Sequence, residues 1–142
     1  MKIVLSPSKT KTITNAASND GANHAVRDGQ FQPHITQEII KHVQSLDVAA
    51  LGKALKLKDD KAQVLFDFYQ DFESHPVGLA CESYDGIAFK YLDWQNLSDE
   101  AKAFGESHLV VMSALYGVVE STMGVRDYRL DMVDKVGINL YD

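Results

Sequence analysis

Three stretches of the sequence carry side chains that can bind an anion, and the first lies near the start. Residues 6–12 read "SPSKTKT", so hydroxyl groups and lysines alternate directly after a short apolar run. Hydroxyls, ammonium groups and backbone N–H groups that follow a strand can hold phosphate or carboxylate oxygens. The stretch lacks the glycines of a phosphate-binding loop, and a solvated turn is the alternative interpretation. The candidate residues here are Ser6, Ser8, Lys9, Thr10 and Lys11.

The second stretch, residues 112–132, places two arginines around one tyrosine, Arg126, Tyr128 and Arg129. A guanidinium group suits bidentate contacts with phosphate, and a tyrosine ring can stack on a base. If the chain turns at Tyr116-Gly117, both arginines could converge on one ligand. The alternative is structural, with Arg129 paired to an acidic neighbour and Tyr128 in the core.

The third stretch, residues 46–65, predicts two short helices joined by a tight connection. Its candidate residues are Gly52, Lys53, Lys56, Lys58 and Lys61. The pattern is similar to a helix-hairpin-helix, which binds phosphates through hairpin amides and flanking lysines without reading bases. The usual glycine-rich hairpin is absent and Asp59-Asp60 would repel phosphate, so an ordinary lysine-bearing hairpin is the alternative.

Patterns typical of catalysis are weaker. The five histidines have no ligand spacing, and no paired cysteines occur, so no metal site and no cofactor are expected. No nucleophile-elbow motif surrounds Ser113. Carboxylates that could act as a general acid or base are Glu82, Asp85, Asp93 and Asp131.

The elements that must position these residues follow from apolar periodicity. Two β-rich runs predict strands at residues 2–5 and 108–112. Thr36 is expected to cap a helix with an apolar stripe through Ile35, Ile39, Ile40 and Val43, and Ser98 is expected to start another. Further expectations are a long loop over residues 8–33, helices around 48–55 and 62–72, and a strand or strand-to-helix turn in 136–142. Residues 80–94 show no clear period.

Composition indicates one globular α/β domain over residues 1–142, with a mixed sheet and flanking helices. Apolar residues make up 45% and charged residues 24% of the 142 positions. A single cysteine, Cys81, fits a reducing cytoplasm, and no apolar run is long enough to cross a membrane. The net charge of −6 argues against a generally basic nucleic-acid coat, so any polyanion site must come from local clustering.

Several short motifs together resemble the YaaA peroxide-stress protein family. They are "LSPSKT" at residues 5–10, "YDGI" at 84–87, "MSALYGVV" at 112–119, "YRLDM" at 128–132 and "NLY" at 139–141. Their order and approximate spacing match the family over the whole chain. Two departures stand out: Glu120-Ser121 replaces a common Arg-Pro, and Asp127 replaces a common proline.

The resemblance implies an incomplete, N-terminal portion of a larger single-domain fold. It implies a cytoplasmic DNA-binding protein that limits iron-driven damage under hydrogen peroxide, with a helix-hairpin-helix in a basic cleft and no established enzymatic activity. Ser6, Lys9, Thr10, the Tyr116-Gly117 turn and Tyr128-Arg129 match the family motifs best. Association through surface left exposed by the missing half is also expected.

The leading hypothesis is a DNA-binding protein that grips phosphate and an exposed base, as in damaged or distorted DNA. The alternative is an enzyme acting on a nucleotide or a nucleic-acid base, which would need a closed pocket near Tyr128. Direct iron sequestration is a third hypothesis, and it would need clustered histidine and carboxylate ligands.

Overall fold

A mixed three-stranded sheet lies at the centre of the computed structural model, which describes residues 1–13 and 33–140. Its strands β1 (Ile3–Leu5), β3 (Leu109–Ser113) and β4 (Gly117–Glu120) have the order β1-β3-β4. β1 pairs parallel to β3, and β3 pairs antiparallel to β4. The predicted mixed α/β class is confirmed, and both predicted strands are found within one residue. A second, two-stranded sheet pairs β2 (Gly78–Leu79) with β5 (Gly124–Val125).

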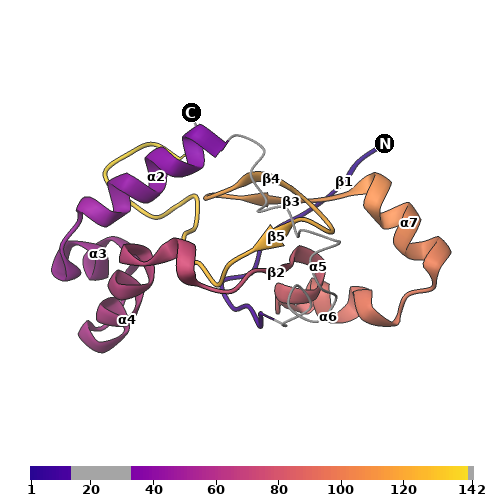
Figure 1. Cartoon of the computed structure of the whole chain (residues 1–142), viewed down its shortest axis with the longest axis horizontal. Helices are drawn as coiled ribbons and strands as arrows, with labels where there is room; N and C mark the ends of the chain where they lie inside the picture. Colours follow the sequence, from indigo (N-terminus) through magenta and orange to yellow (C-terminus); the bar gives the residue numbers. More distant parts are fainter. Residues whose placement is uncertain (14–32, 141–142) are drawn as a thin grey trace.

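Six α-helices flank the strands in the described residues. α2, α3 and α4 gather at one end of the molecule and α7 lies at the other, with the strands between them (Figure 1). None of the helices described is long and apolar enough to cross a membrane. The helices are α2 (Pro33–Ser45), α3 (Val48–Leu55), α4 (Asp59–Gln70), α5 (Ala80–Ser83), α6 (Ile87–Leu92) and α7 (Asp99–His108), with single 3-10 turns at Phe72–Ser74 and Trp94–Asn96.

Side-chain caps explain where two of these helices begin. The Asp47 carboxylate accepts the Ala50 N–H at 2.7 Å before α3, and the Ser98 hydroxyl accepts the Ala101 N–H at 3.2 Å before α7. The cap expected at Thr36 is wrong, because α2 already begins at Pro33. Thr36 is instead buried in the helix, and its Oγ1 donates to the Leu115 carbonyl at 2.9 Å.

The helical hairpin of α3 and α4 packs closely because Gly52 has no side chain. A Cβ built on Gly52 would lie 3.0 Å from the Ala62 Cβ. The connection is short: Lys56 takes a left-handed conformation (φ 56°), and its N–H points back to the Gly52 and Lys53 carbonyls. Leu57 N–H also donates to the Gly52 carbonyl, at 2.8 Å. These two amides are therefore engaged within the hairpin and are not available to a phosphate.

One apolar core joins the helical end to the sheet. Val111 of β3, Val119 of β4 and Leu51 of α3 each have 0% exposed surface. Ile39, Ile40 and Val43 of the predicted stripe on α2 face the same cluster, whereas Ile35 is 37% exposed and lies outside it. Burial of this apolar area is the main favourable contribution to folding.

Residues 136–140 form no helix or strand, so the strand or strand-to-helix turn expected there is wrong for the part described. Most of the loop expected at residues 8–33 lies outside the described residues.

β1 is an edge strand of its sheet, and its Ile3 and Val4 are 39% and 59% exposed.

Candidate anion-binding groove

The hydroxyl-rich opening segment is held against the turn between α5 and α6. The backbone N–H of Asp85 donates to both the Thr10 carbonyl and the Ser8 hydroxyl, each at 3.0 Å. The Ser8 hydroxyl in turn donates to the Thr10 carbonyl at 2.7 Å. A single antiparallel bridge pairs Lys11 with Tyr84. Ser8 therefore shapes the backbone rather than offering its hydroxyl to a ligand.

This arrangement sets Lys11 into the interior, where it is only 8% exposed. Its Nζ donates to the Tyr128 carbonyl at 2.6 Å and to the Lys9 carbonyl at 3.3 Å. It also lies 4.0 Å from the centroid of the Tyr128 ring. Burial lowers the pKa of the Lys11 ammonium from 10.5 to about 8; the Asp127 carboxylate opposes this change and the Arg129 guanidinium adds to it.

Tyr128 belongs to a buried chain of hydroxyl groups. Its phenol oxygen lies 2.7 Å from the Tyr84 hydroxyl and 2.7 Å from the Ser113 hydroxyl, and the residue is 1% exposed. The Ser113 Oγ also accepts the N–H groups of Leu115 and Tyr116. Burial raises the pKa of both phenols, so they stay protonated.

The expected stacking of a base on Tyr128 does not fit this geometry. Its ring is buried, with Lys11 against one face and the Tyr116 ring edge-on at 5.3 Å. A base cannot reach the ring without displacing that ammonium group. The tyrosine thus positions Lys11 and supports the fold.

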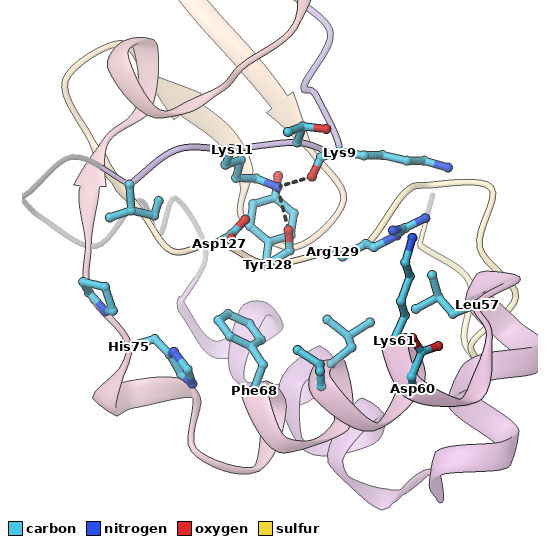
Figure 2. A pocket seen from close by; sticks show the side chains of 15 residues that line it. Lys9, Lys11, Leu57, Asp60, Lys61, Phe68, His75, Asp127, Tyr128 and Arg129 are labelled. Atoms are coloured by element: carbon cyan, nitrogen blue, oxygen red, sulfur yellow. Dashed lines mark hydrogen bonds between the residues drawn. The ribbon is translucent and has the colours of Figure 1, made fainter.

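Lys9, Lys11, Tyr128 and Arg129 do meet in one cavity of about 730 Å³, facing α4. Figure 2 shows the opening and late segments on one side and side chains of α4, including Lys61, on the other. The cavity is lined by Lys9, Thr10, Lys11, Ile13, Leu57, Asp60, Lys61, Val64, Leu65, Phe68, His75, Pro76, Asp127, Tyr128 and Arg129. Two segments more than a hundred residues apart therefore share one wall.

A second cavity, of about 750 Å³, shares Lys9 and Arg129 with the first. It runs along α3 and is lined also by Lys53 and Lys56 of the helical hairpin and by Lys135. We call the two cavities together the basic groove. Within the described part of the chain, the side chains of Lys9 and Arg129 have no hydrogen-bond or ion-pair partner, so both cations are available to a ligand.

The lining of the basic groove reverses the charge of the chain as a whole. Seven cationic and three acidic side chains line it in the described residues, whereas the full sequence holds 14 lysines and arginines against 20 acidic residues. The cations are Lys9, Lys11, Lys53, Lys56, Lys61, Arg129 and Lys135, and the acids are Asp60, Asp127 and Asp134. Local clustering therefore supplies the positive field that the net charge of −6 does not.

Arg126 does not join Arg129 in the groove, contrary to the expected convergence. It is 7% exposed, its Nε donates to the His75 carbonyl at 3.1 Å, and its guanidinium carbon lies 5.1 Å from the Phe72 ring. The chain bends between them, where the Tyr128 N–H donates to the Arg126 carbonyl at 2.8 Å. Arg126 and Tyr128 are buried, whereas Asp127 is exposed and Arg129 is half-buried and lines the groove.

The remaining candidates lie outside the lining of the basic groove. Tyr116 is buried and its hydroxyl accepts the Arg126 N–H at 3.2 Å, and Gly117 begins β4 with φ 76°. Ser6 is exposed, and Lys58 is an exposed residue at the start of α4. Lys135, His75 and Asp127 line the groove although no sequence motif singled them out as ligands, because only the fold brings them there.

Groups suggested for other chemistry are scattered. Glu82, Asp85, Asp93 and Asp131 line none of the cavities described here, and Asp85 lies 3.7 Å from the Lys90 ammonium. No three histidine, cysteine or carboxylate side chains gather as a metal site in the residues the structure covers. His24 lies outside the described residues.

Comparison with known proteins decides the family. The model of the family described as peroxide stress protein YaaA matches residues 1–142. The chain belongs to the YaaA peroxide stress protein family. It is 30% identical over 142 residues to a UPF0246 protein of Finegoldia magna, covering all of this chain and 55% of that protein. A UPF0246 protein of Desulfitobacterium hafniense is 32% identical over 147 residues, covering all of this chain and 56% of that protein.

The relatives that this chain matches in the YaaA family are longer than it is. A UPF0246 protein of Rickettsia bellii is 30% identical over 104 residues, covering 73% of this chain and 42% of that protein. The chain spans about half the length of the curated relatives it matches. This share fits the N-terminal portion that the motif order predicts.

Proposed function

We propose that this portion of a YaaA-family protein binds DNA through its phosphates, in the basic groove, as part of protection against peroxide in the cytoplasm. The observation that carries the proposal is the gathering of seven cationic side chains around a groove on a chain of net charge −6. Phosphate contacts through lysine and arginine supply affinity and position a duplex without reading its sequence.

Three independent segments contribute to this surface, which favours an extended ligand over a single small anion. Lys9 comes from the opening segment, Arg129 from the late segment, and Lys53 and Lys56 from the helical hairpin. The hairpin contributes through lysine side chains rather than through connection amides, since two of those amides are engaged internally. The Tyr128 ring does not stack on a base in this proposal, because the ring is buried.

The test is binding of a fluorescein-labelled DNA duplex to the 142-residue chain, followed by anisotropy across a series of salt concentrations. We expect log Kobs to fall linearly with log salt concentration, with a slope of about −0.9 for each phosphate contact. Arg129→Ala should weaken binding by about 1–3 kcal/mol, because a charged hydrogen bond to phosphate is lost. It should also make the salt slope shallower.

Lys41→Ala is the matched control, because Lys41 is an exposed lysine of α2 that does not line the groove. It should leave both the affinity and the salt slope near those of the unsubstituted chain. A flat salt dependence would exclude phosphate contacts. Equal losses in the Lys41 and Arg129 variants would show that binding is a property of total charge and not of this groove.

A further inference from the structure

One side chain in the basic groove combines burial, a nucleophilic atom and access to a cavity. Lys11 is 8% exposed and lines the cavity of about 730 Å³. Its place is set by the bridge to Tyr84 and by the hydrogen bonds of its own ammonium to the Lys9 and Tyr128 carbonyls (Figure 2). A lysine used only to attract phosphate would more commonly be exposed, as Lys9 and Lys61 are here.

The hydrogen-bond partners of Lys11 also suit an uncharged amine, while the Tyr128 ring at 4.0 Å favours the ammonium. No carboxylate makes an ion pair with it in the described residues, and its two hydrogen bonds both go to neutral carbonyls. A neutral amine has two N–H groups, which match those two acceptors and leave the lone pair for reaction. Burial lowers the Lys11 pKa to about 8, so this amine loses its proton far more readily near neutral pH than an ordinary lysine does.

The neighbours of Lys11 define what such an amine would meet. Lys9, Lys61 and Arg129 line the same cavity and would hold a phosphate group. An unprotonated lysine amine reacts readily with carbonyl carbon. The cavity thus combines an anion-binding rim with a nucleophile, a combination that fits a phosphorylated sugar in its open-chain aldehyde form.

We propose that the Lys11 amine forms a Schiff base with a sugar aldehyde that carries a phosphate group held by Lys9, Lys61 and Arg129. The amine lone pair forms a C–N bond to the aldehyde carbon, and the C=O π electrons pass to oxygen, which takes up a proton as nitrogen releases one. Protonation of the resulting hydroxyl expels it as water and leaves a protonated imine. The balance is amine plus aldehyde plus one proton giving iminium plus water, with no redox change.

The product fits the same site. A protonated imine keeps one N–H, which can still donate to the Tyr128 carbonyl.

Two sources supply this ligand chemistry: an abasic site in DNA, whose ring-opened sugar is an aldehyde flanked by phosphates, and a free sugar phosphate. The first source rests on the proposed function of the groove, whereas the second does not require DNA.

The experiment is reductive trapping of the 142-residue chain with sodium cyanoborohydride, which fixes an imine as a secondary amine. One arm uses a duplex with a single abasic site and the other uses glyceraldehyde 3-phosphate. We expect a one-to-one adduct in at least one arm, with the added mass mapped to the peptide that contains Lys11. Lys11→Arg keeps the positive charge but cannot form the imine, so the adduct should fall at least tenfold. Lys41→Arg, outside the groove, should leave the yield unchanged.

Peptide mapping of the unsubstituted chain keeps the test decisive even if the Lys11 variant fails to fold. Absence of an adduct in both arms, or an adduct mapped to the Met1 amine or another lysine, overturns the proposal. So does equal trapping by a folded Lys11→Arg variant. Binding to an intact duplex is measured separately by anisotropy, so loss of DNA binding with persistent trapping of glyceraldehyde 3-phosphate would refute the proposed function alone.

Discussion

Replacing the buried Lys11 by methionine should remove a specific pH dependence of stability. The ammonium has a pKa of about 8 in the folded chain and 10.5 as an unperturbed group. Between these values the unfolded chain binds more protons than the folded one, so the free energy of unfolding rises with pH. The stability lost to the buried charge below pH 8 is therefore recovered as the pH rises towards 10.5.

The magnitude follows from the size of the change. A difference of 2.5 pKa units corresponds to about 3 kcal/mol in the limit, at 1.36 kcal/mol for each unit. By the same linkage, the free energy of unfolding should rise by about 2 kcal/mol between pH 7 and pH 9.5 because of Lys11 alone. The opposing charges of Asp127 and Arg129 are already included in this pKa change.

The assay is urea unfolding, followed by circular dichroism, at several pH values from 7 to 9.5. The quantity of interest is the free energy of unfolding of the unsubstituted chain minus that of Lys11→Met. Burial raises the pKa of Cys81 to about 12, and the buried tyrosines are also shifted upward, so stability falls as those groups ionise in the unfolded chain. Those contributions are common to both proteins and cancel in the difference.

A difference that stays constant over this range would refute the assignment of Lys11 as a buried ammonium with a lowered pKa. A difference that falls with pH would show that the folded state favours the charged form, through the Tyr128 ring and the carbonyls. Either result would also weaken the Schiff-base proposal, which needs the unprotonated amine.

Three further substitutions test the packing around the site and at the far end of the molecule. Gly105→Ala, normally favourable in a helix, should destabilise by about 1–3 kcal/mol in thermal unfolding, because the new Cβ would lie 2.5 Å from Trp94. Tyr128→Phe should lower the urea-derived free energy of unfolding by about 1–3 kcal/mol, since it leaves the buried Ser113 hydroxyl without that partner; unchanged stability would contradict the hydroxyl chain. Ser121→Ala should be neutral or raise the melting temperature, because its buried hydroxyl has no hydrogen-bond partner within the described residues, and a loss above about 1 kcal/mol would reveal one.

Local patterns predicted the elements well where a single physical signal was decisive. The Ser98 cap and the apolar run predicted as a strand at residues 108–112 each correspond to an observed helix start or strand. The residue type of Thr36 predicts an N-cap and so places the start of α2 too late. In the structure, its hydroxyl donates a tertiary hydrogen bond to the Leu115 carbonyl. A propensity for capping does not reveal whether a side chain is needed elsewhere in the fold.

The candidate site was predictable in its parts but not in its assembly. The opening lysines and Arg129 were identified from their types, and they do line one cavity. What the sequence could not show is that the Tyr128 ring is covered by Lys11, a contact between residues 117 positions apart. Lys135 joined the lining without any local signal, because its position depends on how the late segment passes α3.

The uneven distribution of charge around the basic groove gives the molecule a preferred direction of approach. At a distance, the net negative charge of the chain repels a polyanion, because the acidic excess lies outside the basic groove. The groove attracts the polyanion only within about one Debye length. Association should therefore be slow unless the polyanion approaches the basic groove directly, and complexes formed at other faces should dissociate quickly. Such a surface selects by orientation before any contact is made.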